Sequence, residues 1–175
     1  MIVKRKGIIL LLIIMLLVAL SGLIPYGKAL TVEYENSNRL LAYMPIEDQQ
    51  RFQIRYTHSV HRTLVVEIYQ IDNEQIVQVE LIYENFAIGM PSNAHGEETF
   101  NHKDGKYFIS NMHRVFNKID LRTGQVIANH TLIVDGVQKP FREFVEPGTW
   151  ARLEVASLSF WQRLRGDEIT WKKKD

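Results

Sequence analysis

The sequence predicts an all-β fold, a single antiparallel β-sandwich or partly open barrel of about 8–10 strands. One N-terminal transmembrane or signal helix is expected before this domain, and a short helix near its C-terminal end. Three features of the 175-residue chain predict this fold: a long uncharged segment near the start, apolar residues at alternate positions afterwards, and turn-forming dipeptides between the apolar runs. No repeat, linker or change in composition divides residues 30–175, so we expect them to form one domain.

The first segment has the features of a targeting or anchoring sequence. A basic cluster, Lys4-Arg5-Lys6, precedes 18 uncharged residues from Gly7 to Ile24, which as a helix span about 27 Å. Basic residues on the amino side keep that end in the cytoplasm, so the rest of the chain is expected outside it. Two alternatives stay open. Residues 1–29 remain as a single-pass anchor in the cell membrane, or they are cleaved after Ala29, where Gly27 and Ala29 suit a signal peptidase, and a secreted domain is released.

Four tight turns predict how the strands pair. They are Ser37-Asn38, Asp72-Asn73, Asp104-Gly105 and Asp135-Gly136. In the registers that these turns set, apolar side chains of paired strands share one face. The predicted pairs are Val32 with Tyr43, Ile68 with Val77, Phe100 with Ile109 and Val134 with Val137.

Alternation of apolar and polar residues predicts a strand over 51–60, with His58 on its apolar face and Ser59 on the other. Three further elements are predicted: a strand over 150–156, a short helix over 158–165 capped by Ser157, and one helical turn over 112–119.

Composition excludes several classes of function. The chain has no cysteine, which rules out disulfides, thiolate zinc and iron–sulfur sites, a cysteine nucleophile and a lipid-modified cysteine anchor. The formal charge is +1 for the whole chain; residues 30–175 hold all 20 acidic and 17 of the 21 basic residues, a charge of −3. This balance argues against nucleic-acid binding. No cofactor is expected.

The densest polar patch is residues 56–61, followed by Glu67. His58, Ser59 and Glu67 are the residue types of a nucleophilic hydrolase, but neighbours on one strand point to opposite faces and cannot form a hydrogen-bonded row. For Glu67 we expect a cross-strand ion pair with Arg55. The imidazole of His58 is expected either to be buried with its hydrogen bonds made or to contact a ligand.

A metal site is a second possibility for the same patch, since zinc accepts imidazole and carboxylate ligands. No pair of histidines has the spacing of a known motif, and only a bulge near Ser59-Val60 would turn two imidazoles toward each other. The candidate ligands are Glu67 with His58, His61, His95, His102, His113 and His130. No metal site is therefore assigned.

Residues 86–91 predict a strand that leaves the sheet for a long polar loop, and such loops often border binding sites. Together with the polar patch, these residues resemble the DUF1850 family, small exported domains of unknown function from bacteria and archaea. The resemblance covers most of residues 31–156, but departs from the family at His61, where an acid is expected, and at Ile88, where a small residue is expected. The residues that carry it are Tyr56, His58-Ser59-Val60, Thr63, Glu67, Tyr69, Phe86, Gly89-Met90-Pro91, Leu121-Arg122 and the hairpin around Gly136.

Members of that family tend to be encoded beside tripartite ATP-independent periplasmic (TRAP) transporters. The resemblance therefore implies a membrane-tethered or exported, non-catalytic accessory domain, with the membrane and a transporter permease, a solute receptor or the solute as partners. Two alternatives stay open: an extracytoplasmic hydrolase or metal-dependent enzyme that uses the His58, Ser59, His61 and Glu67 patch, and a structural or assembly factor of the cell envelope. The candidate binding residues are His58, Ser59, Glu67, Tyr69, Gly89, Met90, Pro91 and Arg122.

Overall fold

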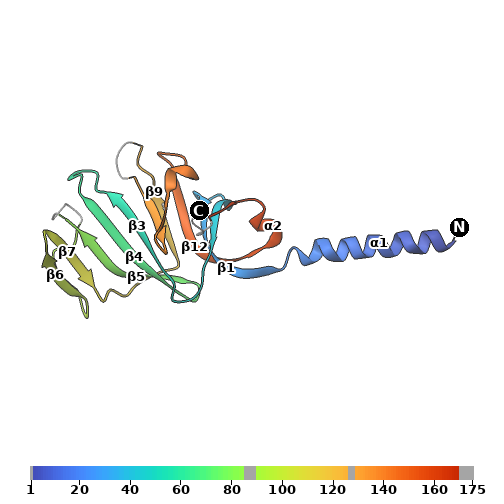
Figure 1. The fold of residues 1–175 in the computed structure, drawn as a ribbon, viewed down its shortest axis with the longest axis horizontal. Coiled ribbons are helices and arrows are strands. Elements are labelled where there is room, and N and C mark those ends of the chain that lie inside the picture. The colour runs from blue at the N-terminus through green and yellow to red at the C-terminus, as the bar shows by residue number, and fades with distance from the viewer. Residues whose placement is uncertain (1, 85–89, 126–128, 170–175) are drawn as a thin grey trace.

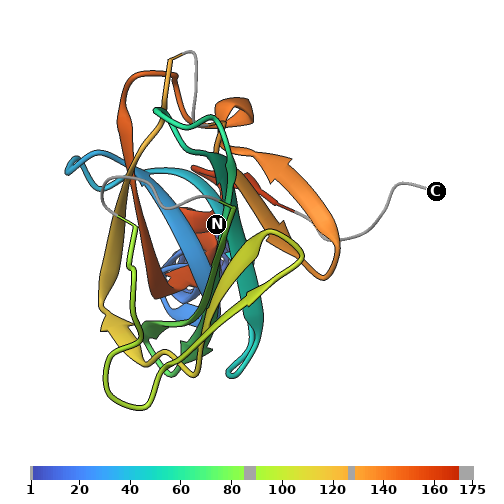
Figure 2. The same cartoon turned by 90° about the vertical axis from the view of Figure 1, so that its left-hand side faces the viewer.

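The structure, a computed structural model, describes residues 2–84, 90–125 and 129–169, with side chains from residue 6 onward. An N-terminal helix, α1 (Ile2–Ser21), is followed by a mostly β body. Figure 1 shows α1 projecting from one end of this body, and Figure 2 shows the body from the opposite end. The body contains two sheets, and neither closes on itself.

The order of the strands in space differs from their order in the sequence. The five-stranded sheet runs β13 (Asp167–Glu168), β2 (Arg39–Pro45), β1 (Pro25–Tyr34), β12 (Trp150–Ser159) and β9 (Lys118–Arg122). The eight-stranded sheet runs β11 (Val137–Pro140), β10 (Thr131–Val134), β3 (Arg51–Thr57), β4 (Leu64–Asp72), β5 (Gln75–Tyr83), β7 (Lys106–Ser110) and β6 (Thr99–Lys103), and β8 (Arg114–Phe116) also pairs with β5. Among the described strands, β13 pairs in parallel with β2 and the other pairs are antiparallel.

The main core is built from both sheets. Its buried members include Leu30, Val32, Met44 and Leu153 from the smaller sheet, and Phe52, Ile54, Ile71, Ile76 and Leu132 from the larger one. In β12 every second residue from Ala151 to Val155 is buried, as the alternation predicts. Each fully buried aliphatic side chain of this kind contributes about 1.5–3 kcal/mol. The prediction of a mostly β domain is confirmed. The structure has two unclosed sheets of five and eight strands, so the expected total of about 8–10 strands was too low.

Two of the four predicted registers are confirmed. Phe100 pairs with Ile109, and Val134 pairs with Val137. Both turns are Asp-Gly dipeptides whose two residues have positive φ, 52° and 73° at 104–105 and 48° and 79° at 135–136. A two-residue turn with positive φ at both positions matches the right-handed twist of paired strands.

The register of the first hairpin was predicted wrongly by one residue. Val32 lies opposite Ala42 rather than Tyr43, and an irregularity follows between Val32 and Glu33. A one-residue shift of this kind exchanges the two faces of a strand. Accordingly Ala42 belongs to the main core, while Tyr43 packs in a separate small cluster with Ala29 and Leu158.

The second hairpin also departs from the prediction. Asp72 pairs with Gln75, so the turn is one residue further along than expected. A bulge between Ile68 and Tyr69 then places Ile68 opposite Glu80 rather than Val77. A bulge inserts one residue into one strand of a pair, and a period of two cannot show where it occurs.

Three predictions about short elements differ from the structure. The predicted helical turn over 112–119 is instead β8 and β9, which pair with β5 and β12. The predicted strand over 51–60 ends at Thr57. The C-terminal helix is present as α2 (Phe160–Arg163), but its cap is Ser159 rather than Ser157, because β12 continues to Ser159. A single 3-10 turn, η1 (Phe141–Glu143), precedes β12.

The predicted N-terminal helix is present, but it does not have the properties expected of a transmembrane helix. Within the described residues, no helix combines the length and apolar character needed to cross a membrane. After α1 the chain enters β1 at Pro25, so residues 25–29, which were expected to belong to the leader, form part of the smaller sheet.

Candidate functional site

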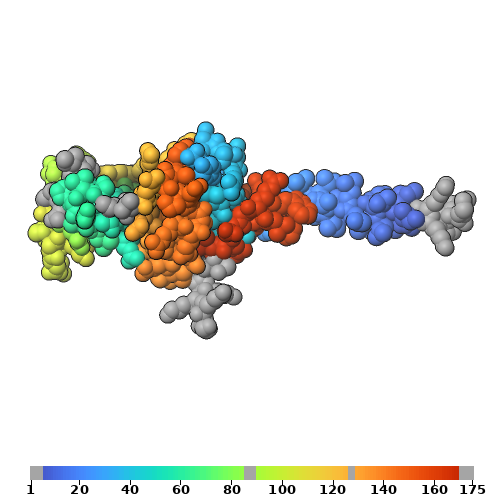
Figure 3. All heavy atoms as spheres, turned by 90° about the horizontal axis from the view of Figure 1, so that it is seen from above, coloured from blue at the N-terminus to red at the C-terminus, as the bar shows by residue number. Residues whose placement is uncertain are grey.

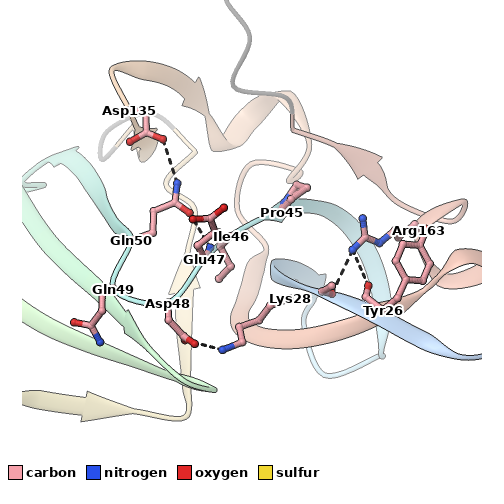
Figure 4. A pocket seen from close by; sticks show the side chains of 11 residues that line it. Tyr26, Lys28, Pro45, Ile46, Glu47, Asp48, Gln49, Gln50, Asp135 and Arg163 are labelled. Carbon is pink, nitrogen blue, oxygen red and sulfur yellow. Dashed lines mark hydrogen bonds and ion pairs between the residues drawn. The ribbon is translucent and has the colours of Figure 1, made fainter.

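A cleft of about 820 Å³ lies between the start of β1, the loop that joins β2 to β3, the turn between β10 and β11, and α2. Figure 4 shows side chains from these four segments around the opening. The loop brings the acidic residues Glu47 and Asp48, the β10–β11 turn brings Asp135, and β1 and α2 bring Lys28 and Arg163. The cleft is therefore lined by both signs of charge.

Two contacts link the loop of the cleft to its neighbours. Lys28 Nζ donates to Asp48 Oδ1 at 2.6 Å, and this bond holds the pKa of the Asp48 carboxyl below its usual value. Gln50 Nε2 donates to Asp135 Oδ2 at 3.1 Å, while Gln50 Oε1 accepts from the Glu47 backbone N–H at 3.0 Å. The loop from 46 to 50 is thereby attached to β1 on one side and to the β10–β11 turn on the other.

Arg163 is held on the other side of the cleft by main-chain and aromatic groups. Its Nη2 donates to the carbonyl oxygens of Tyr26 at 2.9 Å and Gly27 at 3.3 Å (Figure 4). The guanidinium carbon lies 4.5 Å from the ring centre of Tyr26 and 5.5 Å from that of Tyr43, distances at which a cation is attracted to an aromatic ring. The Tyr43 hydroxyl itself donates a hydrogen bond to Glu168 Oε2 at 2.8 Å. Burial, and to a smaller extent this hydrogen bond, raises the pKa of Tyr43 to about 12. Arg163 therefore has a fixed orientation.

A second set of polar side chains lies on the larger sheet. Glu67, on β4, is placed opposite Ile54 of β3 and Leu81 of β5. Tyr69 Oη donates to its Oε2 at 2.9 Å, and Tyr56 Oη donates to its Oε1 at 3.5 Å. Tyr56, Glu67 and Tyr69 are called the tyrosine–carboxylate cluster below. It borders the main core, of which Tyr69 is a buried member.

Burial dominates the electrostatics of the tyrosine–carboxylate cluster. It raises the pKa of Glu67, and the two tyrosine hydrogen bonds oppose the shift only in part. Burial and the adjacent carboxylate both raise the pKa values of Tyr56 and Tyr69. At neutral pH the two hydroxyls therefore stay protonated and remain donors to Glu67.

The expected ion pair between Arg55 and Glu67 is wrong. Glu67 lies opposite Ile54, while Arg55 lies opposite Val66 on the other face of the sheet. The guanidinium of Arg55 instead donates to Gln138 on β11. The register differs from the expected one by a single residue, which is enough to separate the two charges across the sheet.

His58 is a turn residue rather than a residue on the apolar face of a strand. Its backbone N–H donates to the Thr63 carbonyl at 2.8 Å, and its carbonyl accepts from the Arg62 N–H at 2.9 Å. The imidazole Nδ1 accepts from the Val60 N–H at 3.3 Å. The half-buried imidazole thus pairs with a backbone N–H group of the turn between β3 and β4. Ser59 beside it is exposed.

The remaining candidate residues do not gather at one place. Met90 packs against a further core cluster on the larger sheet, which contains Val65, Leu81 and Tyr83. The Pro91 carbonyl accepts a hydrogen bond from the Tyr83 hydroxyl. Arg122 is exposed on β9 of the other sheet. Gly89 and Ile88 lie outside the described residues. Of the eight candidates, the contacts bring Glu67 together with Tyr69, and place Met90 and Pro91 at the cluster that contains Tyr83.

The acidic and imidazole side chains bear on the metal alternative through their positions. Across residues 2–84, 90–125 and 129–169, no three His, Asp or Glu side chains converge as ligands. His58 and His61 have ring centres 5.9 Å apart. His102 stacks on Tyr107, and the ring of His130 lies tilted against that of Tyr56. The imidazoles are thus distributed over separate turns and strands.

Sequence reasoning missed the cleft. Lys28 falls within the segment expected to be a leader or anchor, and Arg163 within the predicted short helix over 158–165. Both reach the cleft because β1 pairs with β12 and α2 then turns back beside the start of β1. No local pattern of residues signals such a meeting of distant segments.

The protein is thus a mostly β domain of two open sheets, with a charged cleft and a separate tyrosine–carboxylate cluster. The profile of DUF1850, a domain of unknown function, matches residues 52–141, just over half of the chain, and the chain belongs to this family. No curated protein and no solved structure shows significant similarity to it. The matched region runs from β3 to the start of η1, so it contains the tyrosine–carboxylate cluster, whereas the cleft residues other than Asp135 lie outside it.

The tyrosine–carboxylate cluster predicts a specific pH dependence of stability. A carboxyl whose pKa is raised by folding binds its proton more tightly in the folded state than in the unfolded state. Its contribution is therefore most favourable below the unfolded pKa, near 4.5, and declines as the pH rises through the raised folded pKa. Relative to Glu67→Gln, the wild-type protein should lose free energy of unfolding over that range. Urea denaturation of both proteins at a series of pH values measures the difference, and a constant difference would contradict it.

Proposed function

We propose that this protein is a non-catalytic, exported accessory domain that binds a component of a TRAP-type solute transporter, or its solute, through the cleft. The cleft is the observation that carries the proposal. Its volume of about 820 Å³ is in the range of small-molecule sites. Its walls present fixed charges of both signs, since the Lys28–Asp48 pair and the held guanidinium of Arg163 are oriented by their neighbours.

The geometry of the polar patch supports a binding role more than a catalytic one. A serine hydrolase needs the serine oxygen, an imidazole and a carboxylate in one hydrogen-bonded row. Here His58 Nδ1 accepts from the backbone of its own turn, and Glu67 accepts from two tyrosines. Ser59 is exposed on the turn. The imidazole of His58 and the carboxylate of Glu67 thus already have structural hydrogen bonds that a catalytic row would have to displace.

The choice of partner is supported by the family neighbourhood and by the first segment of the chain. The basic cluster followed by an apolar run favours export, which would place the β body on the same side of the membrane as a periplasmic receptor. An accessory domain held near a permease meets it at a high effective concentration, so that a weak contact becomes sufficient.

Site-specific crosslinking in intact cells tests this function. A photoreactive residue is placed at Gln49, which is exposed at the cleft, or at Asn101, which is exposed on β6 at the opposite end of the body (Figure 1). We expect the Gln49 probe to capture a transporter permease or solute receptor, and the Asn101 probe to capture several-fold less. Capture of envelope-assembly proteins instead, or equal labelling by both probes, would contradict the proposal. Asp48→Asn, which removes one charge of the cleft, should weaken capture with little change in melting temperature, because exposed ion pairs contribute little to stability.

A further inference from the structure

The end of α1 meets α2 in a direct, well-fitted contact. The indole Nε1 of Trp161 donates to the Ala19 carbonyl at 2.9 Å, and the Trp161 backbone N–H donates to the Gly22 carbonyl at 3.3 Å. A Cβ atom on Gly22 would lie 2.4 Å from the indole nitrogen, so this close approach requires glycine. Trp161 thereby pairs with the Ala19 carbonyl in the last turn of α1, where carbonyl groups have no partner within the helix, and with the Gly22 carbonyl just beyond it.

The surface around this contact is apolar and exposed. The large apolar side chains of α1 from Ile8 to Leu20 are between 48% and 65% exposed. Leu23, Ile24 and Tyr26 continue that surface to the start of β1, and Phe160, Trp161 and Leu164 extend it onto α2. Figure 3 shows α1 leaving the body beside the C-terminal segment that contains α2. Soluble domains rarely expose apolar patches of this extent unless the patch has a partner.

The chemistry of the junction matches the boundary of a lipid layer. Tyrosine and tryptophan concentrate at that boundary because their rings are apolar and their polar atoms can still form hydrogen bonds. The segment 160–165 also carries two arginines, Arg163 and Arg165, and no acidic residue. Arginine beside exposed aromatic residues is complementary to the phosphate of lipid headgroups.

On the basis of the proposed export, we propose that the α1–α2 junction, defined as Leu23, Ile24, Tyr26, Phe160, Trp161 and Leu164, is a lipid-contacting surface. Trp161 lies at the level between acyl chains and headgroups, and the apolar side chains of α1 lie in the acyl region. This contact requires α1 to enter the layer from one side and does not require it to cross.

Lipid contact at the junction would also orient the cleft. Tyr26 belongs to both the junction and the cleft, and its carbonyl accepts a hydrogen bond from Arg163, which also lines the cleft. The cleft would therefore open directly above the headgroups. The end of the body that carries β6 would point away from the membrane (Figure 1).

Depth-dependent fluorescence quenching in the full chain tests the lipid surface. The chain has three tryptophans, at 150, 161 and 171. A variant with Trp150→Phe and Trp171→Phe reports on Trp161 alone. The matched control, with Trp161→Phe and Trp171→Phe, reports on Trp150 at the other end of β12. Both are mixed with vesicles of phosphatidylcholine and phosphatidylglycerol that carry bromine either near the headgroups or deep in the acyl chains.

We expect Trp161 to be quenched several-fold more than Trp150, and most strongly by the shallow bromine. Adding Phe160→Ser and Leu164→Ser to the Trp161 reporter should reduce this quenching while the protein still floats with the vesicles through α1. Flotation with equal quenching of both tryptophans would overturn the proposal, as would failure to float. A dimer in lipid-free sedimentation that is dissociated by Phe160→Ser and Leu164→Ser would assign the surface to a second copy instead. None of these readouts involves the transporter, so the outcome is distinct from that of the crosslinking experiment.

Discussion

Replacing Glu67 with leucine is expected to lower the free energy of unfolding by about 1–3 kcal/mol, because two tyrosine hydroxyls at the border of the core lose their acceptor. Glu67 accepts from Tyr69 at 2.9 Å and from Tyr56 at 3.5 Å. Leucine fills a similar volume, so the loss measures mainly the unsatisfied hydroxyl groups. Removing the partly buried carboxylate, whose charged form is disfavoured by desolvation, offsets part of this loss in free energy. Chemical denaturation at neutral pH gives the value directly.

Removing the donors as well provides the control for this prediction. In a Tyr56→Phe and Tyr69→Phe background, Glu67→Leu leaves no unpaired hydroxyl. Replacing both sides of a buried hydrogen bond by apolar groups of similar shape costs little. We expect the effect of Glu67→Leu to shrink to near zero or to become stabilising there. Equal losses in the two backgrounds would show that the hydrogen bonds of the tyrosine–carboxylate cluster do not determine the stability at this position.

A fragment that begins at Leu30 is expected to be less stable than one that begins at Ile24 by about 3–5 kcal/mol, since each lost hydrogen bond costs about 0.5–1.5 kcal/mol. It would lack Pro25–Ala29, the first half of β1, which pairs with β12 through Ala29 and Lys28 and with β2 through Ala29. Ala29 is fully buried. The carbonyl of Lys28 also accepts from the Ile46 N–H at 3.2 Å.

The loss would extend to the cleft. The carbonyl groups of Tyr26 and Gly27 hold Arg163, and Lys28 pairs with Asp48. Guanidinium denaturation of the two purified fragments compares their stabilities, with the fragment from Ile24 as the matched control. If both fragments unfold at the same denaturant concentration, cleavage after Ala29 is compatible with a complete fold. If the shorter one is destabilised as expected, cleavage at that position would disrupt the smaller sheet.

Local signals predicted part of this fold well. The two Asp-Gly turns have the backbone angles that their residues favour, and their registers are confirmed. The turns at Ser37-Asn38 and Asp72-Asn73 lack glycine, and the strands beside them contain irregularities at Val32/Glu33 and Ile68/Tyr69. An irregularity of this kind depends on neighbouring strands, so the alternation of residues gave the correct elements but the wrong partners.

The candidate site shows the same division. Glu67 and Tyr69 were singled out from the sequence, and they do form a hydrogen bond. The partner expected for Glu67 was Arg55, and the observed second partner is Tyr56, because the register differs by one residue. The sequence did not predict the cleft, because its lining residues come from four segments that lie far apart in the chain, from Tyr26 to Arg163.

By itself the sequence determined the β class, the two Asp-Gly hairpins, the buried face of β12 and the resemblance to the family. These depend on residues close together in the chain, where alternation and turn geometry act directly. Only the tertiary structure decided the partners of Glu67, the cleft around Arg163 and the contact of Trp161 with the end of α1. Trp161 and Ala19 are 142 positions apart, and such contacts arise because β1 pairs with β12 and places the segment before β1 beside the segment that follows β12.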